Sequence, residues 1–94
     1  MDSAKKKRLK IKVAGRVQGV AFRHDTQVKA RQLGLKGLVK NMHDGSVYIE
    51  AEGIETALND FVLWCREGPP PARVEDIKTE AIPVKNDTDF QIRY

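Results

Sequence analysis

The chain has 94 residues, which suit one compact domain and leave no room for a second. Hydrophobic residues make up 40% of the sequence, which argues against a disordered chain, because such a chain lacks the apolar surface that offsets the entropy of folding. The formal charge of +4 suits anionic partners. No stretch approaches the roughly 20 apolar residues that span a bilayer, so we expect no membrane association.

Four of the seventeen basic residues lie together at Lys5–Arg8. Such a run is compatible with an arm that binds nucleic acid or with a solvated terminus, and we favour the second. We therefore expect residues 1–8 to be a disordered basic segment and residues 9–94 to form the domain. The single cysteine, Cys65, cannot form an internal disulfide, and no apolar signal segment follows the basic start. Both features favour a reducing, cytoplasmic location.

Apolar residues alternate with lysines from Leu9 to Ala14, which predicts a strand with one buried face. A helix is expected from Arg23 to Leu33, and Gly34 stands where a left-handed helix cap belongs. Two more strands are predicted at 36–42 and 46–52, joined by the tight-turn sequence His43-Asp44-Gly45.

The most regular helical pattern runs from Ile54 to Cys65, with apolar residues at spacings of three and four. Gly68 and the prolines after it end this helix. A strand follows at Val74–Ile82, where the apolar positions change phase and indicate a bulge or a late start. Alternation at Phe90–Tyr94 predicts a short edge strand.

The order of elements is thus strand, helix, strand, strand, helix, strand, with a short extra strand at the C-terminus. This order indicates an α+β fold, the ferredoxin-like βαββαβ sandwich with a mainly antiparallel sheet. Because each helix offers a single apolar stripe, we expect both helices on one face of the sheet.

The segment between the first strand and the first helix carries the strongest chemical signal. Its sequence is Gly15-Arg16-Val17-Gln18-Gly19-Val20-Ala21-Phe22-Arg23. The two glycines permit a loop with several N–H groups turned inward, and the first helical turn adds unpaired N–H donors. Such groups bind a phosphate-like anion, and Arg23 can add a bidentate contact. On spacing alone, a structural connection with a solvated arginine fits equally well.

Asn41 belongs to the same edge of the predicted sheet. In the split βαβ arrangement the first two strands run parallel with the third between them, so their C-terminal ends lie together. About 10 Å then separates the two backbones, enough for a phosphate and a water. An asparagine amide can donate one hydrogen bond and accept another, so Asn41 can orient a water, although near a hairpin it can also bond its own backbone.

Two stretches resemble the signatures of the acylphosphatase family. The first runs from Val13 to Arg23 and the second from Gly37 to Val47, continuing to Gly53. The resemblance implies the ferredoxin-like fold and the hydrolysis of carboxyl–phosphate mixed anhydrides. It also implies that Arg23 binds the phosphoryl group and that Asn41 orients the attacking water.

Two positions depart from the common pattern of the family. Leu38 stands where an aromatic residue is usual, and Ala21 stands where glycine is frequent. Neither position is catalytic in the family, so we expect effects on packing or on loop flexibility.

The remaining reactive residues point to structural roles. His24 and His43 have no cysteine at ligand spacing, so we expect exposed histidines and no metal site. Cys65 lies on the apolar stripe of the second helix, where a buried small hydrophobe is usual.

The expected enzyme needs few parts. The departing carboxylate has a parent acid pKa of about 4, so no general acid must protonate it. We therefore expect a monomer without cofactor or metal, whose ligands are a small acyl phosphate and inorganic phosphate.

Two other function classes stay open at this point. The first is a ferredoxin-like nucleic-acid-binding module, which needs stacking aromatics on the central strands. The first strand has no aromatic residue, and the third offers Tyr48 alone, so we expect no nucleic acid partner. The second is a regulatory domain that senses a phosphorylated ligand.

Overall fold

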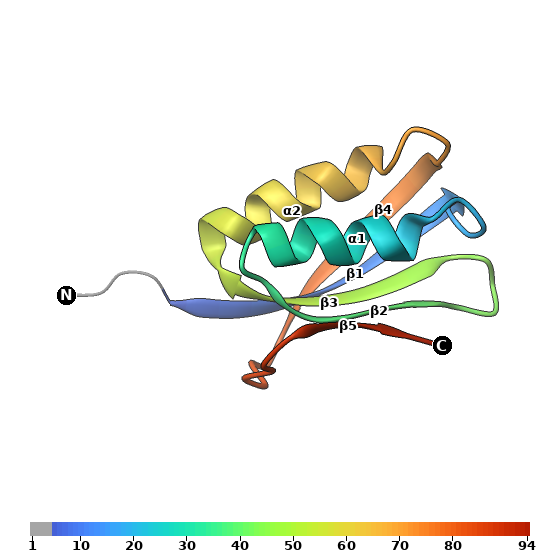
Figure 1. Cartoon of the computed structure of the whole chain (residues 1–94). Helices are drawn as coiled ribbons and strands as arrows, with labels where there is room; N and C mark the ends of the chain where they lie inside the picture. Colours follow the sequence, from blue (N-terminus) through green and yellow to red (C-terminus); the bar gives the residue numbers. More distant parts are fainter. Residues whose placement is uncertain (1–4) are drawn as a thin grey trace.

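The computed structural model describes residues 5–94 as a five-stranded sheet with two helices packed on one face (Figure 1). The predicted α+β ferredoxin-like fold is confirmed. The elements in chain order are β1 (Lys6–Arg16), α1 (Phe22–Gln32), β2 (Lys36–Asn41), β3 (Val47–Ile54), α2 (Glu55–Glu67), β4 (Arg73–Ile82) and β5 (Phe90–Arg93). Among the described residues, neither helix has the length and apolar character that crossing a membrane requires.

The strand order is β4-β1-β3-β2-β5. β3 pairs antiparallel with β1 on one side and with β2 on the other, so β1 and β2 run parallel to each other. Their C-terminal ends, at Arg16 and Asn41, therefore lie on the same edge of the sheet, as the sequence predicted. The short strand β5 adds parallel to β2, which puts the C-terminus beside the end of β2 (Figure 1).

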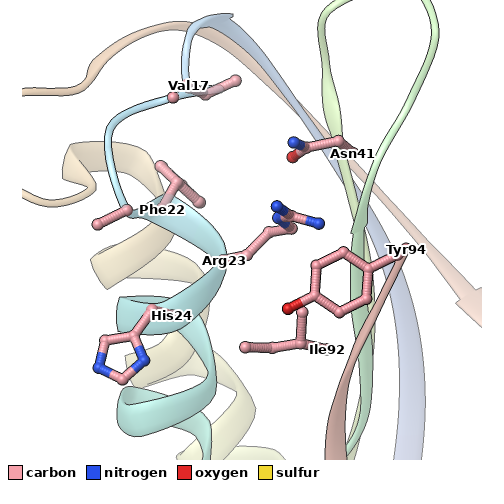
Figure 2. Close-up of a pocket in the computed structure, with 9 residues that line it drawn as sticks. Val17, Phe22, Arg23, His24, Asn41, Ile92 and Tyr94 are labelled. Atoms are coloured by element: carbon pink, nitrogen blue, oxygen red, sulfur yellow. The ribbon is translucent and has the colours of Figure 1, made fainter.

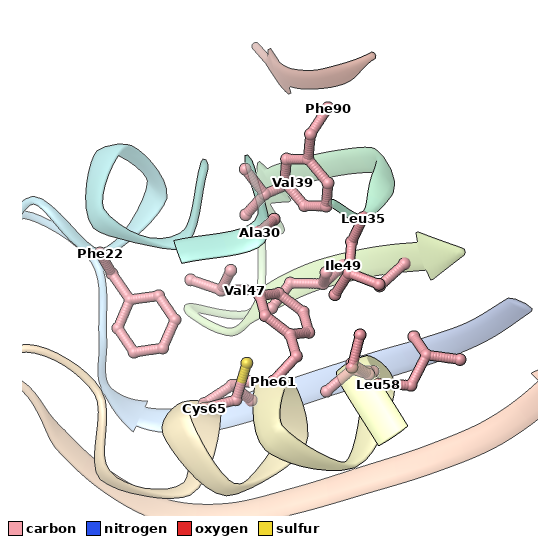
Figure 3. Close-up of a cluster of buried hydrophobic side chains, with 14 of the residues drawn as sticks. Phe22, Ala30, Leu35, Val39, Val47, Ile49, Leu58, Phe61, Cys65 and Phe90 are labelled. Carbon is pink, nitrogen blue, oxygen red and sulfur yellow. The ribbon is translucent and has the colours of Figure 1, made fainter. Parts of the chain in front are cut away.

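The core lies between the sheet and the helices. Alternate residues of the central strands face it, including Ile11, Val13 and Ile49, all fully buried. From α2, Phe61 contributes a ring whose centroid lies 6.1 Å from that of Phe90 on β5 (Figure 3). Burial of each large apolar side chain stabilises the fold by roughly 1.5–3 kcal/mol.

The predicted irregularity of the fourth strand is a bulge. β1 pairs Ala14 with Asp76 and then Gly15 with Val74, so Glu75 is left over in the ladder. Gly15 has a φ of +129°, and a Cβ atom there would lie 2.2 Å from the carbonyl oxygen of Arg73. The close approach of β4 thus requires glycine where β1 leaves the sheet.

The prediction of a disordered segment at 1–8 is wrong for Lys6–Arg8. These residues begin β1 and pair with β3, from Ile54 back to Glu52. Residues 1–4 lie outside the described part of the chain. The sequence interpretation took four consecutive cations as solvated, but Arg8 is 1% exposed because its partners come from distant parts of the chain.

Arg8 is the centre of a buried ion-pair network on the sheet face opposite the helices. Its Nε and Nη2 donate to Oε1 of Glu50 at 2.9 and 2.7 Å, and its Nη1 donates to Oε1 of Glu52 at 3.0 Å. Glu52 also accepts hydrogen bonds from the backbone N–H groups of Lys85 and Asn86, at 2.8 and 2.9 Å. The network therefore fastens the β4–β5 connection to the sheet.

Both carboxyl groups ionise easily in this setting. Burial alone would raise the pKa of each one. For Glu50, hydrogen bonds from Tyr48 and Arg8 outweigh burial, and for Glu52 the Lys85 N–H and Arg8 do so. Both pKa values consequently lie below the usual range of glutamate.

Replacing Arg8 with methionine should lower the free energy of unfolding by about 3–5 kcal/mol, because Glu52 would stay buried with only the exposed Lys6, 3.9 Å away, as a cation. Urea unfolding followed by circular dichroism at neutral pH measures the effect. Lys7→Met, an exposed neighbour in the same strand, is the matched control and should change the midpoint little.

The same network predicts an acid dependence of stability. Because both folded pKa values are depressed, the stability they provide is complete above about pH 4.5, the ordinary value, and is lost as the pH falls through the folded values. The urea midpoint of the wild type should therefore decrease as the pH is lowered below about 4.5. In Arg8→Met this acid-induced loss should be smaller, because Tyr48 and the Lys85 N–H still lower the two pKa values but Arg8 no longer does. Finding it unchanged would contradict the role given to Arg8.

Ala21, immediately before α1, has a φ of +62° and provides no side-chain cap. A left-handed conformation costs a residue with a Cβ roughly 1–2 kcal/mol, whereas glycine adds only about 0.5–1 kcal/mol of unfolded-state entropy. Ala21→Gly should therefore raise the free energy of unfolding by about 0.5 kcal/mol in a urea titration. Ala30→Gly, inside α1, should lower it. A destabilised Ala21→Gly variant would show that this conformation carries no strain.

Candidate active site

A cavity of about 180 Å³ opens where the β1–α1 loop, the end of β2 and β5 meet (Figure 2). The helix start and the sheet edge form its two walls. The lining residues are Val17, Gly19, Ala21, Phe22, Arg23, His24, Asn41, Ile92 and Tyr94.

The loop wall of the cavity is rich in unpaired backbone donors. Within residues 5–94, the N–H groups from Val17 to Ala21 donate to no protein acceptor. The first hydrogen bond of α1 runs from the Asp25 N–H to the Ala21 carbonyl at 3.0 Å, so the first helical turn leaves further N–H groups without a partner in the helix. Left-handed φ values of +75° at Gly19 and +62° at Ala21 turn this segment tightly. The segment thus combines unpaired N–H donors with the positive end of a helix dipole, a combination that suits an anion.

Arg23 projects from the first turn of α1 toward β5. Its guanidinium carbon lies 4.7 Å from the ring centroid of Tyr94, and its Nη1 donates to the Arg93 carbonyl oxygen at 3.4 Å. Among the described residues, no carboxylate pairs with it. Figure 2 shows the guanidinium between Asn41 and Tyr94. The cation is thus held by a ring face and a carbonyl, while its charge stays available to an anionic ligand.

Asn41 is the last residue of β2 and faces the cavity from the opposite side. Its Oδ1 is buried and has no hydrogen-bond partner within the described residues. Such an oxygen in a protein interior nearly always has a partner, and leaving it without one costs about 1–3 kcal/mol. Asn41 therefore brings to the cavity wall a side chain whose acceptor no described residue satisfies.

Not every residue of the predicted loop lines this cavity. Gly15 and Arg16 lie in β1, paired with β4. Gln18 directs its side chain to the β2–β3 turn, and Val20 packs against the core. The remaining loop residues predicted to hold phosphate do line it, together with Arg23 and Asn41: Val17, Gly19, Ala21 and Phe22.

Three lining residues were not predicted from the sequence. Ile92 and Tyr94 reach the cavity because β5 pairs in parallel with β2, and the alternating C-terminal pattern did not say which edge β5 would join. His24 follows Arg23 in the first turn of α1 and projects away from Asn41 in Figure 2.

The other reactive side chains lie elsewhere. Cys65 is fully buried in the core, and burial raises the pKa of its thiol. His43 is exposed in the β2–β3 turn. No three His, Cys, Asp or Glu side chains gather as metal ligands in residues 5–94.

Comparison with known proteins assigns this architecture to a family. The sequence model of the acylphosphatase family matches residues 9–92. An acylphosphatase of Thermotoga maritima is 49% identical over 88 residues, which are 94% of this chain and 98% of that protein.

Solved structures give the same assignment. The structure of an acylphosphatase from Coxiella burnetii superposes with a TM-score of 0.93 at 36% identity and covers 99% of this chain and 100% of its own. The acylphosphatase of Bacillus subtilis gives a TM-score of 0.91 at 42% identity, over 94% of this chain and 99% of its own. Matches of this extent in sequence and in structure show that the chain belongs to the acylphosphatase family.

Proposed function

We propose that this protein hydrolyses acyl phosphates to a carboxylate and inorganic phosphate, using the β1–α1 loop and Arg23 to hold the phosphoryl group and Asn41 to place the attacking water. Its membership of the acylphosphatase family makes it a hydrolase of acid anhydrides. The observation that best supports the residue roles is the buried, unpartnered Oδ1 of Asn41. It shares one cavity with Arg23 and with a loop of free N–H groups.

The phosphoryl group would bind on the loop side of the cavity. Its non-bridging oxygens carry the negative charge, and the free N–H groups from Val17 to Ala21 are fixed donors for them. Arg23 would add two charge-assisted hydrogen bonds without first leaving a carboxylate partner. Donors that are already in place need little reorganisation as charge builds up in the transition state, and this is the main source of rate acceleration here.

The water would bind on the β2 side. The Asn41 Oδ1 accepts a hydrogen bond from it, which aims a lone pair at phosphorus. Phosphoryl transfer passes through a loose transition state, in which the nucleophile needs correct placement more than deprotonation. An amide therefore suffices where another hydrolase would use a general base.

The leaving group needs little assistance from the protein. A carboxylate whose parent acid has a pKa of about 4 departs as an anion at neutral pH. The residues of the cavity accordingly meet the needs of the reaction without an acid catalyst, and we propose that the enzyme works without a metal or cofactor. We also propose a cytoplasmic monomer, in keeping with a lone, buried cysteine.

The competing nucleic-acid-binding function finds little support. Tyr48 lies on the sheet face opposite the helices, but the Lys40 ammonium lies 5.6 Å from its ring centroid, and its hydroxyl donates to Glu50 at 2.6 Å. On the ring face that Lys40 occupies, a base could stack only by displacing the lysine.

Arg23→Ala and Asn41→Ala should each lower kcat for a small acyl phosphate by at least about 10²-fold, by analogy with the removal of an oxyanion-hole donor. Initial rates of acetyl phosphate hydrolysis measure the change. Arg23→Lys should lie between the wild type and Arg23→Ala, because it keeps the charge but loses the bidentate geometry.

Two surface variants serve as matched controls for these substitutions. Arg31→Ala, on the exposed side of α1, and Asn59→Ala, exposed on α2, should retain near-normal rates. Near-normal hydrolysis by a folded Arg23→Ala or Asn41→Ala protein would remove that residue from the proposed mechanism.

Hydrolysis should be insensitive to metal removal. Protein dialysed against a chelator should hydrolyse acetyl phosphate at the same initial rate as untreated protein, and added Mg²⁺ or Zn²⁺ should not increase this rate. A loss of activity that a divalent cation restores would contradict the metal-independent mechanism.

A further inference from the structure

Gln18 lies in the middle of the β1–α1 loop, yet it does not line the cavity. Its side-chain amide reaches across to the β2–β3 turn instead. The Nε2 group donates to the carbonyl oxygen of Met42 at 2.8 Å and to that of Ser46 at 2.9 Å. Both N–H bonds of the amide are thus engaged, and Met42 is the residue that directly follows Asn41.

The turn that receives these hydrogen bonds is itself well fixed. The Met42 N–H donates to the Ser46 carbonyl at 2.8 Å, so the two acceptors of Gln18 are joined to each other. Asp44 accepts hydrogen bonds from the N–H and hydroxyl groups of Ser46, at 3.0 and 2.6 Å. It also pairs with Lys12 of β1 at 2.9 Å. Gln18 is therefore attached to a turn that has several hydrogen bonds of its own.

The loop has few other polar attachments. Within the described residues, the two hydrogen bonds of Gln18 are the ones that fasten residues 17–20 to any other part of the chain. Gly19, next to Gln18, has a left-handed φ of +75° and no atom within 4 Å of the place where a Cβ would stand. Packing does not hold the loop at Gly19. Val17 and Val20 pack against the core on either side, and the Gln18 amide adds the hydrogen bonds that tie the loop to the end of β2.

We propose that Gln18 is a positioning residue that sets the separation between the phosphate-binding loop and the water site at Asn41. This inference rests on the function proposed above. In an in-line displacement the water, the phosphorus and the leaving oxygen must align, and the two sides of the cavity come from different strands. A misplacement of about 1 Å can lower a rate by 10²-fold. The link between the two sides should therefore affect kcat more strongly than it affects the affinity for phosphate.

The first test is Gln18→Met, which keeps the length of the side chain and removes both donors. The kcat for acetyl phosphate should fall by about 10- to 100-fold. The inhibition constant of inorganic phosphate should change by less than about 3-fold, because the loop N–H groups and Arg23 remain. A parallel loss of phosphate affinity and kcat would overturn the inference, because Gln18 would then shape the loop itself. An unchanged kcat would overturn it as well.

Gln18→Glu gives a second readout within one folded protein. An ionised carboxylate faces two carbonyl oxygens and cannot donate to either, whereas the protonated acid can donate to one. The kcat of Gln18→Glu, relative to that of the wild type, should therefore rise as the pH is lowered from 7 to 5. A constant ratio across this range would contradict a role for the donated hydrogen bonds, even if Gln18→Met fails to fold.

Gln27→Met is the matched control. Gln27 is on α1, outside the cavity lining, and its Nε2 donates to the Phe90 carbonyl oxygen at 2.9 Å. The same chemical change there should leave kcat near that of the wild type. If kcat fell as much in Gln27→Met as in Gln18→Met, loss of any glutamine-to-backbone hydrogen bond would lower the rate. This result would overturn the positioning role of Gln18.

The outcome separates this inference from the proposed function. If Arg23→Ala and Asn41→Ala are inactive while Gln18→Met hydrolyses normally, the positioning role alone fails. If the Arg23 and Asn41 variants are themselves active, the proposed function fails first.

Discussion

The antiparallel pairing of β3 with both of its neighbours is the constraint on which the site depends. Because β3 lies between β1 and β2, those two strands must run in the same direction and end at the same edge of the sheet. The loop after β1 and the last residue of β2 are thereby brought to opposite walls of one cavity (Figure 2). No side-chain contact is needed for this coarse placement, since backbone hydrogen bonds provide it.

Side chains then refine what the sheet provides. The core holds α1 against the sheet, so its first turn points at the cavity, and Tyr94 and the Arg93 carbonyl orient Arg23. On the other face, the Arg8 network fastens the connection that leads into β5. The residues that contact the Arg23 guanidinium thus follow a connection that is fastened by an ion-pair network on the far side of the sheet. In a protein this small, the core and the Arg8 network stabilise the fold and also position the elements around the cavity.

Much of this arrangement could be predicted from local patterns. Strand alternation, helical periodicity and the turn residues predicted all seven elements. The phase change after Val74 predicted a bulge or a late start, and the structure has the bulge. Once the order of elements indicated the fold, the edge shared by Asn41 and the loop followed from topology alone. The structural role of a residue could be predicted where it follows from the residues a few positions away in the sequence.

What the sequence did not predict depends on residues far apart in the chain. Arg8 was assigned to a solvated segment because its partners, Glu50 and Glu52, are more than forty positions away. Tyr94 was missed at the site because the edge that β5 joins depends on competition between β2 and β4 for a short strand. Gln18 was predicted to bind phosphate through the loop backbone, and the hydrogen bonds from its side-chain amide to the β2–β3 turn were not foreseen. Each of these depends on long-range contacts that no short pattern contains.

The bulge in β4 also affects how copies of this protein meet in a crowded solution. β4 is a ten-residue strand at the outer edge of the sheet, and an uninterrupted edge of this length is a template on which another molecule could add a strand. The extra residue Glu75 breaks the regular spacing of outward-facing amide and carbonyl groups, and exposed charges of both signs follow it at Asp76, Lys78 and Glu80. The irregularity that lets the chain turn out of the sheet toward its cavity thus also protects that border against self-templated aggregation.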